Sequence, residues 1–556
     1  MNSLLKRTFF IGLSVLIQFP LFAQKDDVPK GWHLLDRQAD GFYGISLKQA
    51  YDFIKSKKLK SRTVVVAVID SGIDTTHEDL RPVLWRNPKE VPGNFIDDDK
   101  NGYVDDIYGW NFIGGKDGKN VETDSYEAAR VYHRLKSKWE GKDISTMKLS
   151  KDELDEYNMW KRAEKNIVGD TKTSSLEMLF LKRAYSSAMK SDSILKAALN
   201  KERYTGKDLE SFNPTESEIK KAKAMMLSLF QGNEAMETSN KEFLEGFGDY
   251  VNGEEKKAEA GSVAPKEYRA EIVKDNYADF NDRFYGNGDV MASSKSALHG
   301  THVAGIIGAA RNNGIGVDGI ADNVKLMMIR AVPDGDEHDK DVALAIRYAV
   351  DNGAQVINMS FGKGFSPEKR WVDEAVKYAE TKGVLLVHAA GNDAKNIDTT
   401  FNYPGPVFQV DNYRSPVWIT VGASGDPKIG GFTAAFSNYG KQEVDVFAPG
   451  VRIYSTIPGS NTYGNLQGTS MASPVVAGLA ALIMQYFPTL SAQQVKMVIE
   501  KSAQAPGAKA KNPETQELVD LTDISKTGGI INAYEAVKLA STLKGERKDP
   551  AKTKAF

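Results

Sequence analysis

The run Thr63-Val64-Val65-Val66-Ala67-Val68-Ile69-Asp70-Ser71-Gly72 decides the fold class of this chain. Its first seven residues form a continuous, largely β-branched apolar stretch, which is typical of a strand buried on both faces in a parallel sheet. Asp70 follows at the carboxyl end, where ligands and catalytic groups gather in open α/β sheets. By itself, Asp70 fits a catalytic acid or an Asx-turn residue equally well.

Segments further along the chain extend this pattern. Residues 324–332, 356–360 and 384–389 have the composition of strands, and residues 342–351 and 368–382 have that of helices. Strands that alternate with helices predict a parallel sheet covered on both faces. We therefore expect an α/β fold with a doubly wound, mainly parallel sheet.

A run of small residues around position 470 predicts a helix with a serine at its start. Gly468 and Thr469 form a turn, Ser470 stands at its apex, and a run rich in Ala, Val and Leu follows. A hydroxyl at a helix N-terminus lies near unpaired backbone N–H groups and the positive end of the helix dipole. That setting favours a nucleophile, but it suits a helix cap equally.

His299 and Asn392 occupy comparable positions. His299 opens a helical run rich in Gly and Ala, and Asn392 follows the strand-like segment 384–389. The expected sheet would bring both side chains to the edge that carries Asp70 and Ser470. An imidazole can take the proton of a serine hydroxyl while a carboxylate orients the ring. The amide of Asn392 could donate to an oxyanion.

The composition changes between about residues 118 and 282. Lys, Glu, Ser and Met become frequent there, and the β-branched runs vanish. Apolar residues at helical spacing predict two amphipathic helices. One is marked by Leu176, Leu179, Phe180, Ala184 and Ala188, and the other by Ile219, Ala222, Met226 and Leu229. Residues 251–265 are polar and predict a flexible link, so the region is interpreted as a helical insertion.

An acidic run after residue 96 predicts a calcium loop. Asp97, Asp99, Asn101 and Asp105 occupy positions 1, 3, 5 and 9 of a D-x-D-x-N-G pattern. Calcium prefers several oxygen ligands, and closely spaced carboxylates repel one another without a cation. Position 12 is Tyr108 in place of a glutamate, so an EF-hand proper is not expected. A solvated acidic turn is the alternative.

The composition excludes several classes of function. The 556-residue chain is 41% hydrophobic and 26% charged with a net charge of −2, so no basic field points to nucleic acid. The sequence has no cysteine, which excludes disulfides, thiol catalysis and cysteine-ligated metals.

The N-terminus predicts export. Lys6 and Arg7 precede an apolar stretch at 9–22, and Ala23 offers a cleavage point, as in a signal peptide. A membrane anchor is the alternative, but the apolar stretch is short for a span of ~20 residues. We expect an extracellular or periplasmic protein with no stable membrane anchor after cleavage.

With these residues in place, the sequence closely resembles the subtilisin-like serine peptidase family, the subtilases. Residues 68–72, 299–305 and 468–474 look like its three catalytic boxes, in the order acid, base, nucleophile. Ala390-Gly391-Asn392 looks like the segment that carries its oxyanion asparagine. The resemblance implies that the catalytic residues are Asp70, His299, Ser470 and Asn392.

The resemblance also implies substrate and metal sites. Residues 358–362 resemble the strand that pairs with the substrate backbone, and Tyr403-Pro404 resembles the S1-pocket turn. The implied substrate-binding residues are Ser360, Phe361, Gly362 and Gly391. Asp79 matches the loop aspartate of the family's strong calcium site and Asn313 lies in the matching loop, which adds a second candidate for structural Ca²⁺.

The resemblance covers about 63–117 and 283–542, so the expected peptidase domain at 63–543 is interrupted by the insertion at about 118–282. The other parts are a signal peptide at 1–23, a short N-terminal segment at 24–62 and a polar tail at 544–556. Secreted subtilases usually carry a longer propeptide before the domain. We therefore hypothesise that the N-terminal segment or the insertion assists folding or covers the cleft.

The other histidines are interpreted as structural. We expect His302 and His388 to pack in the core, and His33, His133 and His338 to lie at the surface. His77 falls in a loop of the form that follows the family's aspartate box.

We therefore expect an exported serine endopeptidase that hydrolyses polypeptide substrates through an acyl-enzyme on Ser470. The alternative from another class is a catalytically silent subtilase-fold binding protein, which would have lost a triad residue. An esterase would carry its serine in a G-x-S-x-G elbow ahead of the acid and the histidine, an order that this chain lacks.

Overall fold

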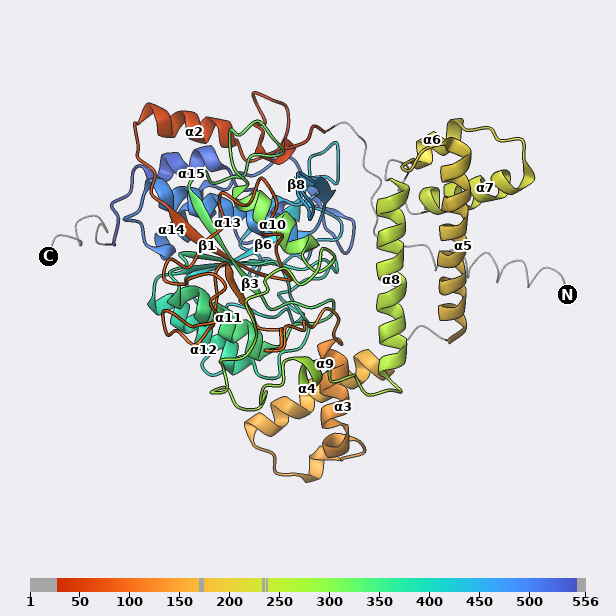
Figure 1. Ribbon diagram of the computed structural model, residues 1–556, viewed down its shortest axis with the longest axis horizontal. Coiled ribbons are helices and arrows are strands. Elements are labelled where there is room, and N and C mark those ends of the chain that lie inside the picture. Colours follow the sequence, from red (N-terminus) through yellow and green to blue (C-terminus); the bar gives the residue numbers. More distant parts are fainter. Residues whose placement is uncertain (1–27, 170–174, 233–235, 237–238, 548–556) are drawn as a thin grey trace. The chain divides into compact units, whose positions relative to one another are not determined.

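The computed structural model describes residues 28–169, 175–232, 236 and 239–547 (Figure 1). The predicted signal peptide at 1–23 and the tail beyond residue 547 lie outside these residues. The described chain divides into two compact units. The sheet unit comprises Pro29–Glu127 and the chain from Lys266 onward, and the helical unit comprises Ala128–Pro265.

Within the described residues, the sheet unit is built on a seven-stranded sheet with the order β2-β3-β1-β4-β5-β6-β7, and every neighbouring pair is parallel. The strands are β1 Val64–Asp70, β2 Gly109–Asn111, β3 Val324–Arg330, β4 Val356–Met359, β5 Leu385–Ala389, β6 Trp418–Ser424 and β7 Val446–Pro449. β1 lies between β3 and β4, so both of its edges are paired and both of its faces are covered.

Helices cover both faces of this sheet (Figure 1). α11 Asp339–Asp351 and α12 Lys369–Thr381 pack on one face, and α10 Leu298–Gly308, α13 Thr469–Tyr486 and α14 Ala492–Ser502 pack on the other. The predicted α/β class with a doubly wound parallel sheet is thereby confirmed. The strand-like runs named above correspond to β1, β3, β4 and β5, and they do not include β6, although β6 is buried along its whole length.

Smaller elements complete the sheet unit. They are α2 Leu47–Ser56, α9 Tyr268–Ile272, α15 Ala533–Ala540, the 3₁₀ turns Trp32–Leu34 and Leu521–Asp523, and the antiparallel pairs β8 Ile453–Thr456 with β9 Tyr463–Leu466 and β10 Ala510–Lys511 with β11 Leu518–Val519.

Among the described residues, α13 is the one helix that is long and apolar enough to cross a membrane. Its apolar window is 89% buried, and it contacts five strands of the sheet, so it is a core helix here.

The short N-terminal segment packs into the sheet unit from residue 29 onward. Trp32 is buried and its indole Nε1 donates to the Val451 carbonyl at 3.1 Å. The Ala533 N–H donates to the Ile45 carbonyl at 2.7 Å, and α2 packs against α15. This segment therefore contributes to the same core as the sheet.

The helical unit has its own apolar core. Its elements are α3 Glu127–Trp139 beyond its first residue, the 3₁₀ turn Ile144–Thr146, α4 Lys151–Val168, α5 Ser175–Leu199, α6 Gly206–Ser211, α7 Ser217–Gly232 and α8 Asn240–Ala260. Met226, Phe230, Phe243 and Phe247 are buried at its centre. This compact unit lies within the predicted insertion at 118–282, and Val121 and Arg269 of that range are buried in the sheet unit.

Two predictions for the helical unit are wrong in detail. On α5, Leu176, Leu179 and Phe180 are exposed (61%, 44% and 44%), and Met178 and Leu181 face the core in their place. α8 continues to Ala260, so most of residues 251–265 is helix and not a flexible link. The first error arises because a surface helix with scattered apolar residues has two plausible buried faces.

Candidate active site

Asp70 stands at the carboxyl end of β1, as predicted. Its side chain is 2% exposed. Its Oδ1 atom accepts hydrogen bonds from the Ser71 N–H at 2.7 Å and from His299 Nδ1 at 2.7 Å. A carboxylate in this position orients the imidazole, because an ionised carboxylate can only accept and Nδ1 must therefore carry the proton.

The first turn of α10 places His299 beside Asp70. Gly300, the next residue, lies so close to the Asp70 turn that a Cβ atom there would be 2.2 Å from the Gly72 carbonyl oxygen. Burial of the half-buried ring lowers the pKa of His299, but the charge and hydrogen bond of Asp70 raise it by more. The pKa of His299 therefore lies above its ordinary value of 6.5, and Nε2 is left as the acceptor in the neutral ring.

Ser470 is the second residue of α13 and lies beside the carboxyl end of β4. Its Oγ donates to the Ser360 carbonyl at 3.0 Å, and Ser360 Oγ donates in turn to the Ser470 carbonyl at 2.9 Å. Because Ser360 follows β4 and β4 is next to β1, Ser470 lies at the same sheet edge as Asp70. In the part of the chain that the structure describes, the Ser470 hydroxyl makes its hydrogen bond to Ser360 and not to His299.

Asn392 is held with its amide nitrogen free. Its Oδ1 accepts from the Thr469 N–H and from Thr469 Oγ1, each at 2.9 Å. The Thr469 hydroxyl accepts from the Gly391 N–H at 3.0 Å. With the oxygen engaged by two donors, Nδ2 is turned toward Gly468, beside the start of α13. Asn392 is thus presented to the site as a donor.

The residues implied to bind substrate lie around this point. Ser360, Phe361 and Gly362 continue from β4, and the Phe361 carbonyl accepts from His388 Nε2 at 2.8 Å. Gly391 has φ +98°, and a Cβ atom there would be 2.4 Å from Asn438 Nδ2, so no other residue fits. A cavity of about 210 Å³ opens at the neighbouring turn; its lining includes His388, Thr400, Asn402, Tyr403 and Pro404.

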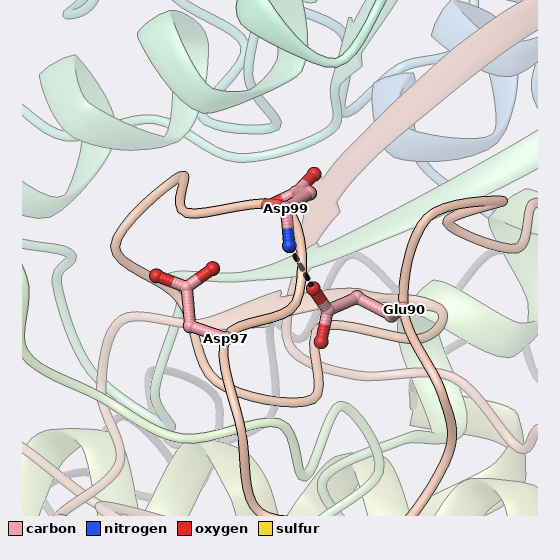
Figure 2. A group of neighbouring side chains, drawn as sticks. All are labelled: Glu90, Asp97 and Asp99. Carbon is pink, nitrogen blue, oxygen red and sulfur yellow. Dashed lines mark hydrogen bonds between the residues drawn. The ribbon is translucent and has the colours of Figure 1, made fainter.

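The acidic loop brings three carboxylates together, as Figure 2 shows. One oxygen from each of Glu90, Asp97 and Asp99 lies within 4.8 Å of the others. Glu90 was not predicted. It reaches the loop because the N–H groups of Asp99 and Asp105 donate to its two carboxylate oxygens, at 3.1 and 3.2 Å.

Two of the predicted calcium ligands are turned away from this cluster. The Asp105 oxygens accept from the Gly93 and Phe95 N–H groups, each at 2.9 Å, and Asn101 Oδ1 accepts from the Tyr103 N–H at 2.7 Å. The oxygens of Glu90, Asp97 and Asp99 fit a hard divalent cation. The fold therefore brings together Glu90, Asp97 and Asp99. This set shares only Asp97 and Asp99 with the four ligands predicted from the sequence pattern.

The second calcium candidate brings its two predicted residues together and stays a prediction. Asn313 Nδ2 donates to Asp79 Oδ1 at 2.6 Å. The Val317 N–H and the Tyr463 hydroxyl both donate to Asp79 Oδ2 at 3.2 Å. Donors hold both oxygens of this buried carboxylate, as they hold both oxygens of Glu90.

The histidines outside the catalytic set are mostly buried. His302 and His388 lie in the core as expected, and burial lowers the pKa of His302 to about 3 and of His388 to about 4. His33 is also buried, contrary to expectation, and burial lowers its pKa to about 4. His338, likewise expected at the surface, contacts Asp124 Oδ2 at 3.0 Å with its side chain 12% exposed.

Sequence reasoning also missed Thr469, whose hydroxyl and N–H orient Asn392. It stands directly before Ser470, but nothing in the residue type alone separates an orienting hydroxyl from an ordinary turn residue. Only the position of the 391–392 turn beside α13 shows the role.

Comparison with known proteins agrees with this geometry. The sequence profile of the subtilase family matches residues 61–520. Subtilisin DY of Bacillus licheniformis is 44% identical over 209 residues, which span 37% of this chain and 70% of that protein. Thermitase of Thermoactinomyces vulgaris is 34% identical over 271 residues, which span 48% of this chain and 85% of that protein.

Among solved structures, a protease of Pseudoalteromonas arctica PAMC 21717 aligns over 93% of this chain with 20% identity and a TM-score of 0.45. The family match extends across the three catalytic boxes and most of the chain, and the chain is a serine endopeptidase. It belongs to the subtilase family.

Proposed function

We propose that this serine endopeptidase uses Ser470 as nucleophile, His299 as general acid and base, and Asp70 as the group that orients His299. The observation that carries the proposal is the 2.7 Å contact from His299 Nδ1 to Asp70 Oδ1, at the sheet edge where α13 begins. An imidazole with Nδ1–H held by a carboxylate has Nε2 free to accept a proton.

In the acylation step, Ser470 Oγ attacks the carbonyl carbon of the scissile bond while His299 Nε2 takes the hydroxyl proton. The tetrahedral oxyanion then collapses, the C–N bond breaks, and the imidazolium gives its proton to the leaving amine. A water molecule, activated by His299, hydrolyses the ester and releases the acid product and free Ser470.

The Ser470 hydroxyl must first leave the Ser360 carbonyl. Rotation about χ1 moves Oγ between staggered positions without moving the backbone. Nucleophile–base hydrogen bonds are often loose in substrate-free enzymes and tighten when substrate binds. The present orientation is therefore a resting state of the proposed nucleophile.

Asn392 is the proposed side-chain donor to the oxyanion. The two bonds from Thr469 fix its amide so that Nδ2 faces the start of α13. The Ser470 N–H, in the first turn of α13, is the natural second donor, since first-turn amides lack helical partners.

Residues 360–362 and Gly391 are proposed to bind polypeptide substrate as an added strand. Backbone groups that continue from β4 can exchange hydrogen bonds with an extended peptide, which gives affinity with little dependence on side chains. We propose that the parts of the chain follow in the order signal peptide, N-terminal segment, peptidase domain interrupted by a helical insertion at about 118–282, and polar tail.

We also propose a structural Ca²⁺ held by Glu90, Asp97 and Asp99. The ion would supply the positive charge that offsets repulsion among the three carboxylates and would tie the loop to residue 90. A ligand that binds only the folded state at 100 times its Kd stabilises by about 2.7 kcal/mol. Chelation should lower the unfolding temperature of the parent but not of Glu90→Gln; equal shifts in both would contradict this site.

Export through the predicted signal peptide is part of the proposal. Lys6 and Arg7, the apolar stretch at 9–22 and Ala23 support it. N-terminal sequencing of the protein recovered outside the cytoplasm should begin at Gln24. A chain that still begins at Met1 would contradict cleavage.

A fluorophosphonate probe separates the proposed enzyme from a catalytically silent binding protein. The probe should label the purified parent at Ser470, and Ser470→Ala should abolish labelling and peptide hydrolysis together. Equal labelling of parent and variant would overturn the nucleophile, and no labelling of a folded parent would favour the binding protein.

A further inference from the structure

Lys363 ends the segment that is proposed to bind the substrate backbone. Its N–H donates to the Tyr403 carbonyl and its carbonyl accepts from the Tyr403 N–H, both at 2.9 Å. This pair of bonds joins segment 360–362 to the turn at 403–404. The backbone of Lys363 therefore holds together the two walls of the proposed cleft.

The side chain of Lys363 is buried and fully paired. It is 1% exposed, and Nζ lies 2.9 Å from Glu127 Oε2, 2.9 Å from Asp339 Oδ1 and 2.7 Å from the Glu337 carbonyl. An ammonium has three N–H donors, and these three acceptors use all of them. Moving this ammonium away from its acceptors would leave a buried charge unpaired, which costs free energy. The backbone of Lys363 is therefore held in one place.

The acceptors come from elements outside the cleft. Glu127 is the first residue of α3, whose remaining residues belong to the helical unit, and its side chain is 4% exposed. Asp339 opens α11 and also accepts from Ser366 Oγ at 2.9 Å and the Glu368 N–H at 2.8 Å. The ammonium thus ties the cleft segment to the helix through which the insertion begins.

Burial alone would not give this lysine a functional role. Lys496 is also buried against a carboxylate, 2.9 Å from Asp445 Oδ1, but it lies in α14 and its backbone borders no part of the cleft. Buried ion pairs are weak evidence of stability, since apolar replacements are often neutral. Lys363 differs from Lys496 because its backbone exchanges two hydrogen bonds with the backbone of Tyr403.

We propose that Lys363 is a positioning residue: its pairing with Glu127 and Asp339 fixes segment 360–362 against the 403–404 turn, and the start of α3 thereby sets the affinity for extended peptides. This inference rests on the proposed function of that segment. Glu127, Asp339 and Lys363 all belong to the sheet unit, so the contact lies within that unit.

The effect should appear in KM more than in the chemistry at Ser470. An extended peptide uses the backbone groups of residues 360–362, whereas a small fluorophosphonate reacts with Ser470 and needs few of them. A mutation that loosens binding common to ground and transition states raises KM and leaves kcat largely unchanged.

The test uses the full mature chain with four variants: Lys363→Met, Lys363→Arg, Glu127→Gln and the control Lys496→Met. For each, kcat and KM are measured with a tetrapeptide anilide, and a small fluorophosphonate gives the rate of Ser470 labelling. We expect Lys363→Met and Glu127→Gln to raise KM about tenfold or more with labelling within about twofold of the parent. Lys363→Arg should recover part of the affinity, and Lys496→Met should change neither value.

An unchanged KM in Glu127→Gln would overturn the proposal, even if Lys363→Met fails to fold, because Glu127→Gln keeps the size of the side chain. A labelling rate that falls in parallel with kcat/KM would also overturn it, since the lesion would then lie at Ser470. A parent that the probe does not label would count against the proposed function instead.

Discussion

The sheet unit and the helical unit bury their apolar residues in different ways, and the sequence is informative about them to different degrees. In the sheet unit, β1 is covered on both faces, so an unbroken apolar run has only one interpretation, and the polar residue that ends it must lie at a sheet edge. In the helical unit, each helix buries one stripe and exposes another. The spacing there indicates helices without fixing which side faces the core.

Because of this difference, short motifs identify single residues in the sheet unit, whereas the composition of the helical unit indicates helices only. Asp70, His299 and Ser470 are each followed or preceded by small residues that the close packing of the site requires, as at Gly300. The helical unit is held by its apolar core, which includes Met226 and Phe243. Four predictions, from the largest expected effect to the smallest, would sharpen or break the comparison.

The largest effect is expected at Ser470. Replacement by alanine removes the nucleophile, and kcat should fall about a millionfold while KM stays near the parent value. Steady-state hydrolysis of a peptide anilide measures both. A residual activity within about a hundredfold of the parent would show that the chemistry does not rest on this serine.

Acid should destabilise the sheet unit through its buried histidines. Burial lowers the pKa of His33 and His388 to about 4 and of His302 to about 3. Below pH 6.5, these histidines therefore bind more protons in the unfolded chain than in the folded chain. The contribution of these three rings to the free energy of unfolding should fall as pH falls, by up to about 4 kcal/mol per pH unit. Burial raises the pKa of Glu337 to about 8 and of Asp106 to about 6, and these two groups act in the opposite sense.

Urea unfolding between pH 6.5 and 5 measures this slope, and His33→Leu should reduce it by about one third. The raised pKa of His299 changes the free energy of unfolding in the opposite direction, and it does so at higher pH. Its raised pKa stabilises the fold below the unfolded pKa, and that contribution is lost as pH rises through the folded pKa. A slope in His33→Leu equal to that of the parent would show that this ring titrates normally.

An intermediate effect is expected at Asn392. Asn392→Ala removes the proposed oxyanion donor, and kcat should fall about 10²- to 10³-fold with little change in KM or unfolding temperature. Thr469→Val should show a weaker effect of the same kind, since it frees the Asn392 amide to rotate. A rise in KM without loss of kcat would place Asn392 in ground-state binding instead.

The smallest effect is expected on the outer face of α5. Phe180 is 44% exposed, so Phe180→Gln should change stability within about 0.5 kcal/mol. Met226 is fully buried, and Met226→Ala should cost about 2–5 kcal/mol. Thermal unfolding of both variants checks which residues are buried. Equal losses of stability in the two variants would show that Phe180 faces the core, as the apolar spacing predicted.

Much of the site could be predicted because its residues stand in short, continuous motifs. β1 with Asp70, the start of α10 with His299 and the start of α13 with Ser470 are each local patterns. Glu90 was missed because it approaches Asp97 and Asp99 through a turn that no spacing rule describes. Asp105 fitted the spacing, but its oxygens are taken by the N–H groups of Gly93 and Phe95.

The burial of single residues was harder to predict than the elements that carry them. His33 was expected at the surface because nothing beside it in the sequence suggests a core position. It is buried because the N-terminal segment packs into the sheet unit around Trp32. Arg269 is buried for a similar reason, since it pairs with Asp341 far along the chain.

By itself, the sequence determined the α/β class and the family resemblance, and it supplied the proposed acid, base and serine, because both strand burial and catalytic motifs are encoded in neighbouring residues. Only the tertiary structure decided that Ser470 rests against Ser360, that Thr469 orients Asn392, and that Lys363 is paired with Glu127. These contacts join residues from separate elements, and their energies depend on burial and direction, which no local pattern contains.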